Sequence, residues 1–168
     1  MENSAGFLEQ NKLDGNIKAN IAFGGEMSER TVIIRNEIKN CRNEGIFAIE
    51  CPFSWIVNNN ITENTDGIIT VDANPKIMGN LIRDQKRAGI ILSGHSNPKV
   101  IDNVISDNYT CGIFFRESSL GYVRRNTLAN NYYQISIEGL TKLKLDPIIN
   151  GNNMVGHNDI STSFCNIF

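Results

Sequence analysis

A repeat of about 22 residues constrains the fold of this chain more than any other feature of its sequence. Residues 67–88 read GIITVDANPKIMGNLIRDQKRA, and residues 89–111 read GIILSGHSNPKVIDNVISDNYTC. The repeating glycines are Gly45, Gly67, Gly89 and Gly112, with steps of 22, 22 and 23 residues. Self-similarity at such a period is typical of stacked-repeat architectures.

A second landmark runs in constant phase with these glycines. It is an asparagine followed two places later by an aliphatic residue, and from Asn36 onward it precedes the next glycine by eight or nine residues. Asn20 and Gln134 occupy the places where the same rule would put a glycine. The two landmarks together indicate five clear coils, with partial coils at each end. The repeating asparagines are Asn11, Asn36, Asn59, Asn80, Asn103 and Asn126.

Apolar residues alternate with other residues after each glycine, which is the period of a β-strand. Two further apolar positions recur in every coil, so each coil is expected to hold three short strands joined by tight turns. Each fully buried aliphatic side chain contributes roughly 1.5–3 kcal/mol, and ladders of them can hold a loop-rich chain together. The sequence therefore predicts an all-β fold, a right-handed parallel β-helix of about 22–23 residues per coil, with the hand taken from the general crossover rule. One expected inner ladder is Ile46, Ile68, Ile90 and Ile113.

The repeating glycines and asparagines have an expected backbone role. Tight corners between strands often need a positive φ, which glycine adopts freely and asparagine better than most residues. A second polar series follows five places after the repeating asparagines. Its side chains either form hydrogen-bonded ladders between coils or are solvated turn residues. The series comprises Asn16, Asn64, Gln85, Asn108 and Asn131, interrupted by Cys41.

Length and charge narrow the functional classes. The chain has 168 residues and a formal net charge of −2, which fits one domain and gives no electrostatic case for nucleic-acid binding. No apolar run approaches the roughly 18–20 residues of a membrane span, and the N-terminal residues lack a signal segment. We therefore expect no nucleic-acid or membrane partner. The expected location is cytoplasmic, which includes cytoskeletal or ciliary sites, although a mature secreted form would look similar.

The cysteines and histidines show no metal-binding pattern. The two histidines, His95 and His157, lie far apart, and no Cys-x-x-Cys spacing occurs. Free structural thiols therefore fit better than disulfides or zinc, and we expect neither a metal site nor a cofactor. The four cysteines are Cys41, Cys51, Cys111 and Cys165.

The repeat also predicts the domain organisation. Residues 1–150 are expected to form the coils, and residues 151–168 an irregular tail that caps the last coil or binds a partner. The segment AGFLEQNKL near the start matches LGYVRRNTL at 120–128, so the chain enters partway round a coil. Solenoids normally carry caps over their open ends. We therefore expect either a longer β-helix or a protein partner at the open N-terminal coil.

The repeats NPKIMGNLIRDQKRAGIIL and NPKVIDNVISDNYTCGIFF resemble those of the right-handed parallel β-helix family with the pectin-lyase-like fold. Within it they look most like the β-helix region of F-box ubiquitin-ligase subunits, in which Asn-Pro, Asn-x-Ile and Gly-Ile recur in this order. The resemblance covers roughly residues 5–150. It implies the fold and a substrate-recognition role in a ubiquitin ligase or adaptor. The F-box and the Cys/His-rich zinc module of those ligases are not found in this sequence.

Many β-helix relatives cleave polysaccharides, so two carboxylates at catalytic spacing would indicate an enzyme. Glu50 and Asp72 lie five places after Gly45 and Gly67, on adjacent coils, and Glu117 has the same register two coils after Asp72. A coil spacing near 4.8 Å would bring two carboxylates within the roughly 5–5.5 Å of a retaining glycosidase pair. The motifs of polygalacturonase-type hydrolases are absent, apart from a faint similarity at Gly94-His95-Ser96. We therefore expect no catalytic residue; if the protein is an enzyme, these three carboxylates are the candidates.

An apolar stripe is the stronger candidate for function. The position two places after each glycine should point outward, yet it is apolar on four consecutive coils. Contiguous exposed apolar surface often marks an interaction site, although the tail, another domain or a neighbouring chain could cover it. The expected partner-binding residues are Phe47, Ile69, Ile91 and Phe114.

The sequence thus predicts a non-enzymatic β-helical scaffold that binds another protein. It would act as an adaptor, a ligase substrate-recognition region or a structural component of a large cytoskeletal or axonemal assembly. The alternative is a carbohydrate-binding or polysaccharide-cleaving β-helix protein. Fold alone does not decide between these functions.

Overall fold

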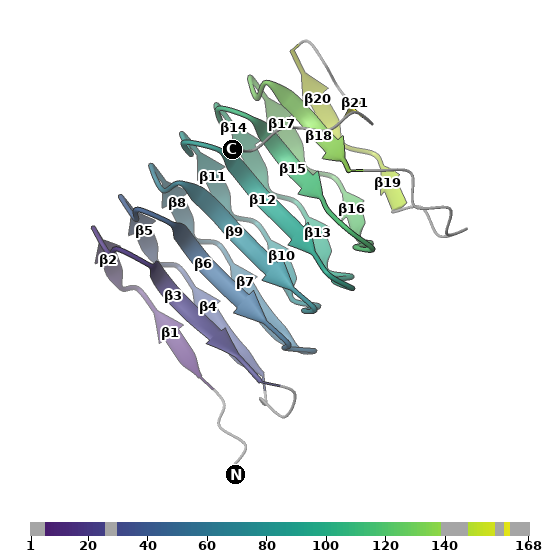
Figure 1. Ribbon diagram of the computed structural model, residues 1–168. Helices are drawn as coiled ribbons and strands as arrows, with labels where there is room; N and C mark the ends of the chain where they lie inside the picture. Colours follow the sequence, from purple (N-terminus) through teal and green to yellow (C-terminus); the bar gives the residue numbers. More distant parts are fainter. Residues whose placement is uncertain (1–5, 26–29, 139–147, 157–159, 162–168) are drawn as a thin grey trace.

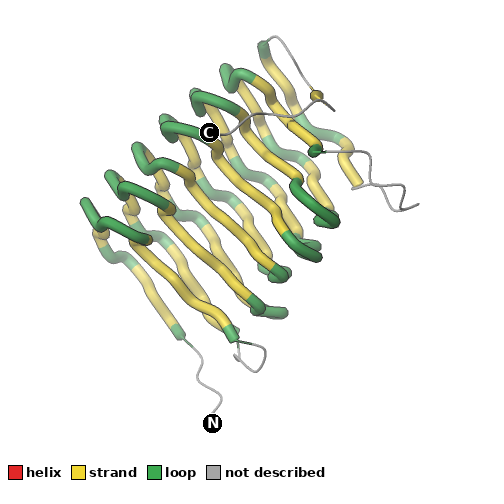
Figure 2. Tube along the Cα trace, viewed as in Figure 1, coloured by secondary structure: helices red, strands yellow, loops and turns green. Residues whose placement is uncertain are grey.

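Three parallel sheets wind around one core to form a solenoid (Figures 1 and 2). The structure is a computed structural model that describes residues 6–25, 30–138, 148–156 and 160–161. Within these ranges the chain is all-β, without a helix, and every sheet contains seven strands. The predicted fold class is confirmed.

Sheet A holds the first strand of each coil, and each strand pairs in parallel with the strand of the next coil. Its strands are short, with three or four residues each. In order they are β1 (Phe7–Glu9), β4 (Thr31–Ile34), β7 (Ser54–Val57), β10 (Lys76–Met78), β13 (Lys99–Ile101), β16 (Tyr122–Arg124) and β19 (Ile148–Asn150).

Sheet B follows after one turn and has the same order of coils. Its strands carry the aliphatic residue that stands two places after the repeating asparagine. They are β2 (Lys12–Asp14), β5 (Glu37–Lys39), β8 (Asn60–Thr62), β11 (Leu81–Arg83), β14 (Val104–Ser106), β17 (Thr127–Ala129) and β20 (Asn153–Val155).

Sheet C completes each coil and contains the longest strands, which begin close to the repeating glycines. From the N-terminal coil onward they are β3 (Ala19–Gly24), β6 (Glu44–Ile49), β9 (Asp66–Val71), β12 (Ala88–Ser93), β15 (Cys111–Phe115), β18 (Tyr133–Ile137) and β21 (Ile160–Ser161).

The core is a set of aliphatic ladders between the three sheets. Ile46 pairs in register with Ile68, Ile68 with Ile90, and Ile90 with Ile113, and all four are fully buried. Sheets A and B contribute equivalent ladders, so one cluster runs through the successive coils. The stacking of inner isoleucines that the sequence predicts is confirmed.

A continuous ladder of asparagines holds the corner between sheets A and B. The side-chain Oδ1 of Asn103 accepts the backbone N–H of Asn80 at 2.9 Å and its Nδ2–H at 3.0 Å. Nδ2 of Asn80 also donates to the carbonyl of Ile56 at 2.8 Å. The pattern repeats at every coil, which satisfies buried backbone groups that the turn leaves without strand partners. The ladder comprises Asn11, Asn36, Asn59, Asn80, Asn103, Asn126 and Asn152.

The second polar series forms a ladder as well, at the corner between sheets B and C. Oδ1 of Asn64 accepts the backbone N–H of Cys41 at 3.0 Å, and Oε1 of Gln85 accepts that of Asn64 at 3.0 Å. Asn108 and Asn131 continue the series toward the C-terminal coils. Of the two interpretations of this series, the hydrogen-bonded ladder is confirmed.

The expected reason for the glycines is wrong. Gly45, Gly67, Gly89 and Gly112 are not among the glycines with positive φ, and they lie within strands of sheet C. Their requirement is space, because an added Cβ would lie 2.4–2.7 Å from a backbone carbonyl oxygen of the next coil.

Positive φ instead occurs immediately before the ladder asparagines. Asn58 precedes Asn59 with a φ of 53°, and Asp102 precedes Asn103 with a φ of 56°. The corner therefore uses two adjacent positions, one in the left-handed region and one whose side chain bonds to the neighbouring coil. The other turn positions with positive φ include Arg35, Gly79, Asp84, Asp107 and Arg125.

The strands continue beyond residue 150. β20 pairs with β17 in sheet B, and β21 pairs with β18 in sheet C. The irregular segment therefore does not begin where the sequence predicted, at residue 151. The rest of the expected tail, including the cap assigned to it, falls largely outside the described residues.

Candidate functional site

The apolar stripe predicted from the sequence stacks as expected along sheet C. Phe47 pairs with Ile69, Ile69 with Ile91, and Ile91 with Phe114. These side chains lie on the outer face, because neighbours such as Ile113 belong to the inner core cluster.

The prediction that the apolar stripe is exposed is wrong for its two C-terminal residues, Ile91 and Phe114. Phe114 is 0% and Ile91 3% exposed, whereas Phe47 and Ile69 are half-buried. The reason is a second apolar cluster outside the main core, in which outward side chains of neighbouring strands pack on one another. It comprises Ala88, Ile91, Cys111 and Phe114, with Ile69 and Tyr133 packed against it. The stripe therefore offers accessible apolar surface only near β6 and β9.

The three candidate carboxylates share a turn position between sheets C and A. Glu50, Asp72 and Glu117 all have positive φ, between 48° and 57°, and all are exposed. Asp72 accepts the backbone N–H of His95 at 2.8 Å, and Glu117 accepts that of Gly94 at 2.6 Å.

The hydrogen bonds of Asp72 oppose the chemistry of a general acid. The backbone N–H and the side chain of His95 lower the pKa of Asp72, whereas a general acid needs a raised pKa. Asp72 and Glu117 thus act here as acceptors for the backbone of the neighbouring coil, which is a structural role.

A cleft on the outer face of sheet A is the better candidate for binding. It has a volume of about 390 Å³ and spans β7, β10 and β13 together with the turns before them. Trp55, the only tryptophan of the chain, lines this cleft with 42% of its surface exposed. Strand alternation positions it, because Ile56 points into the core and both of its neighbours in the strand point outward. Phe53, 70% exposed, lies at the same cleft.

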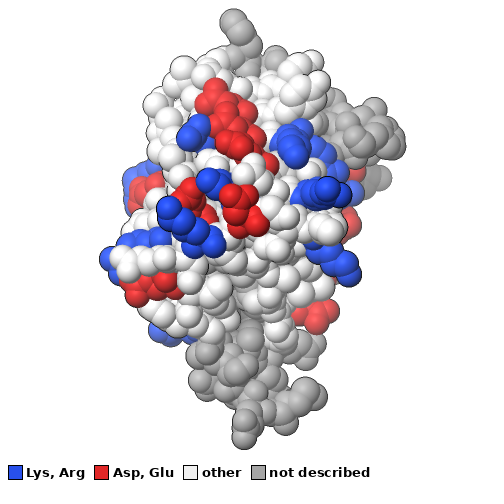
Figure 3. All heavy atoms as spheres, turned by 90° about the vertical axis from the view of Figure 1, so that its left-hand side faces the viewer, with Lys and Arg blue, Asp and Glu red and all other residues white. Residues whose placement is uncertain are grey.

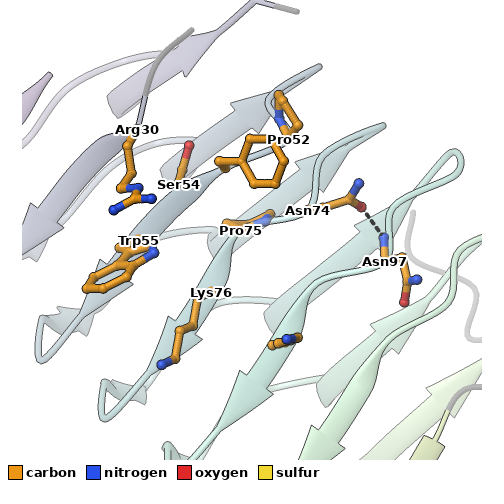
Figure 4. Close-up of a pocket in the computed structure, with 10 residues that line it drawn as sticks. Arg30, Pro52, Ser54, Trp55, Asn74, Pro75, Lys76 and Asn97 are labelled. Carbon is orange, nitrogen blue, oxygen red and sulfur yellow. Dashed lines mark hydrogen bonds between the residues drawn. The ribbon is translucent and has the colours of Figure 1, made fainter. Parts of the chain in front are cut away.

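Two cations flank the indole ring of Trp55 (Figure 4). The guanidinium carbon of Arg30 lies 5.7 Å from the ring centroid, and Nζ of Lys76 lies 5.5 Å from it. Arg30 directly precedes β4, and Lys76 belongs to β10. These are the two strands next to β7 in the sheet. A cation this close to a tryptophan face is attracted by the ring quadrupole.

The cleft lining is cationic. Of the residues that the structure describes, Arg30, Lys76 and Lys99 line it, and no acidic residue does. Lys76 and Lys99 are directly opposite each other in neighbouring strands, an arrangement of like charges that is destabilising on its own. Among the ion pairs within the described parts of the chain, none involves these three cations.

One acidic residue lies near enough to interact with Lys76. Asp102 has a lowered pKa, caused first by its hydrogen bonds with Arg125 and only last by the charge of Lys76. Its two oxygens accept from Nε and Nη2 of Arg125 at 2.7 and 2.8 Å. The carboxylate is therefore already paired in a bidentate manner, and it leaves Lys76 available to a ligand.

An aliphatic column runs beside the cations on the same face. Val57, Met78 and Ile101 are paired in register across β7, β10 and β13. Val57 is 6% exposed, and Met78 and Ile101 are half-buried. The outer face of sheet A thus combines one aromatic–cationic column with one apolar column.

Sequence reasoning missed this cleft, although the sequence contains a signal for it. Two coils carry Asn-Pro-Lys at 74–76 and 97–99, and the preceding coil has Phe53-Ser54-Trp55 at the same register. Trp55 thus occupies the repeat position that holds lysine in the next two coils, and such a departure from a repeat can indicate a binding surface. The two Asn-Pro-Lys segments are joined at the cleft by a hydrogen bond between their asparagines. The backbone N–H of Asn97 donates to Oδ1 of Asn74 at 2.6 Å (Figure 4).

Part of the surface carries both signs of charge. Figure 3 shows acidic and basic side chains interspersed on the side that it presents, and several pairs link neighbouring coils, such as Arg35 with Glu9. Within the described residues no group of three or more His, Cys, Asp or Glu side chains could hold a metal ion. The described residues also contain no helix that is long and apolar enough to cross a membrane.

The three sheets and their repeated corners define a right-handed parallel β-helix. The family model of the right-handed β-helix region matches residues 1–163, and the chain belongs to this family. Comparison with curated proteins gave no match, and comparison with solved structures gave none.

Proposed function

We propose that the protein is a non-enzymatic β-helical scaffold that binds another protein through the outer face of sheet A. The observation that carries the proposal is Trp55, which lies 42% exposed in a cleft among Phe53 and three cations. Tryptophan and arginine are the residues most enriched at the energetic centres of protein interfaces. The aliphatic column beside the cleft adds apolar contact area.

The proposal moves the binding face from sheet C to sheet A. Phe47 and Ile69 stay accessible enough to extend an interface, but Ile91 and Phe114 serve packing within the chain. A role as adaptor, as substrate-recognition region of a ubiquitin ligase or as component of a cytoskeletal or axonemal assembly is compatible with such a face. The resemblance of the repeats to F-box β-helix regions supports the ligase role. A cytoplasmic location fits all three roles.

Carbohydrate binding is the second candidate. The cleft combines a tryptophan with the side-chain amides of Asn74 and Asn97, and such groups can contact sugar rings and hydroxyls. However, Arg30 and Lys76 already lie over the indole ring, so a sugar ring would have to displace a cation before it could stack.

Site-specific photo-cross-linking in an extract of the source cells tests the proposal. A photo-reactive amino acid at Phe53 should cross-link to the same protein in repeated experiments, and Trp55→Ala should abolish that cross-link. The matched control carries the photo-reactive residue at Tyr109, which is 79% exposed on a turn outside the cleft. Equal cross-linking from both positions would contradict the proposal, and retention of a polysaccharide by the Trp55 cleft instead of a protein would favour the second candidate.

A further inference from the structure

We infer that the sheet A cleft accepts an acidic, extended peptide segment of its partner, an inference that rests on the proposed protein-binding function. The charges of the cleft carry it. Arg30, Lys76 and Lys99 line one hollow, and its described lining contains no acidic residue, in a chain whose net charge is −2. A carboxylate placed there would relieve the repulsion between the two lysines and form charge-assisted hydrogen bonds.

The geometry of the sheet fixes how such a segment lies. Trp55, Lys76 and Lys99 are consecutive in one column across β7, β10 and β13, so the segment runs along the solenoid axis and crosses the strands. Neighbouring strands are about 4.8 Å apart, and an extended peptide advances about 6.8 Å for every two residues. If one peptide residue contacts Trp55, the peptide residues two and four positions further on lie within reach of Lys76 and Lys99. The long lysine side chains make up the difference between the strand spacing and the advance of the peptide.

The environment of the cleft favours a peptide over an acidic glycan or a nucleic acid. The indole ring is flanked by Arg30 and Lys76, which leaves its faces poorly placed for stacking by a sugar or a base. The adjacent column of Val57, Met78 and Ile101 offers apolar contacts that suit an aliphatic side chain. The occupant that matches both columns is a segment with one apolar residue followed by acidic residues at alternate positions.

The single tryptophan gives a direct readout of occupancy, because fluorescence excited at the red edge of the indole absorption, where the four tyrosines absorb little, comes from Trp55. The probe is a blocked peptide with one leucine followed by two glutamates, each separated by glycine. We expect it to change the fluorescence in a saturable manner, and we expect binding to weaken with added salt. The same peptide with glutamines in place of the glutamates should bind at least about tenfold more weakly, since each lost charge-assisted contact is worth on the order of 1.5 kcal/mol.

Variants of the protein test the named lysines. Lys76→Glu combined with Lys99→Glu should remove binding of the glutamate peptide, while Lys86→Glu, an exposed lysine on a turn outside the cleft, should leave it unchanged. The circular dichroism spectra of both variants must match that of the unmodified protein. Lys76→Gln with Lys99→Gln provides a milder change if the charge reversal impairs folding.

Several results would overturn the inference. They are equal binding of the glutamine and glutamate peptides, unchanged binding by the double lysine variant, or saturation of the cleft by tetragalacturonate or a single-stranded oligonucleotide but not by the peptide. Failure of the proposed function looks different, because the cross-link from Phe53 would then be absent or no stronger than the one from Tyr109. A cross-link that persists but maps to a segment without acidic residues would leave the scaffold function standing and reject the acidic segment.

Discussion

A Cβ atom added to Gly67 would lie 2.4 Å from the carbonyl oxygen of Gly89 and 2.9 Å from Cγ2 of Ile82. Both glycines lie inside strands of sheet C. A shift of either strand to make room for the Cβ would therefore disturb its pairing with the coils on both sides. The repeating glycines thus set how closely successive coils approach each other.

Gly67→Ala should therefore destabilise the protein by about 1–3 kcal/mol, as overpacking of a close-packed interior does. Urea unfolding followed by circular dichroism measures this change. Gly6→Ala is the control, because its added Cβ meets only the side chain of Thr31, at 3.4 Å. Equal midpoints for the two variants would show that the coils can separate at little cost.

Asn80→Ala should lower the free energy of unfolding by about 2–4 kcal/mol. The change removes the acceptor of the Asn59 backbone N–H and the donor to the Ile56 carbonyl, and each buried group left unpaired costs about 1–3 kcal/mol. Denaturant titration gives the difference. Asn60→Ala, an exposed neighbour at the start of β8, should stay within about 0.5 kcal/mol of the unmodified protein. A similarly small effect at Asn80 would mean that water replaces the ladder.

Phe114→Ala should cost about 3–5 kcal/mol, the range for truncation of a buried phenylalanine. Its side chain is 0% exposed and lies in the outer cluster of sheet C. Phe47→Ala changes the same column where the ring is only half-buried, and we expect a clearly smaller loss. Thermal and urea unfolding should rank the two variants in this order, and the reverse order would contradict the assignment of Phe114 to packing.

The pair of Asp102 and Arg125 should make a pH-dependent contribution to stability. Hydrogen bonds from Arg125 lower the pKa of Asp102 below its ordinary value of 3.8. A lowered folded-state pKa gives stabilisation that is present above the ordinary value and is lost as the pH falls through the folded-state value. Arg125 has a raised pKa, so it stays charged over this whole range.

Asp102→Asn should therefore be less stable than the unmodified protein at neutral pH, and the difference should shrink below about pH 4. Urea midpoints measured from pH 7 to pH 2.5 provide the test. Arg125→Gln should reproduce the effect, because it removes the same pair from the other side. A gap that stays constant down to the lowest pH would show that the effect of Asp102 does not come from its charge. Both side chains are exposed, so the difference should be small, as it is for surface ion pairs.

The sequence predicted the path of the chain much better than its surface. Burial at period two and the spacing of isoleucines depend only on local alternation, and the inner ladder from Ile46 to Ile113 lies where the sequence placed it. The reason for the repeating glycines was missed, because a close approach of the next coil involves a carbonyl 22 residues away. The end of the coils was also missed, since β20 and β21 carry a weaker form of the pattern.

The candidate site shows the limit more clearly. The sequence by itself determined that Phe114 would point outward, because alternation along a strand decides that, and the same alternation positions Trp55. Only the tertiary structure decided that Phe114 is enclosed by its neighbours while Trp55 stays exposed between Arg30 and Lys76. The physical reason is that the exposure of a side chain depends on its neighbours in adjacent coils. These neighbours are about 23 residues away in the sequence, so the alternation along one strand does not predict them.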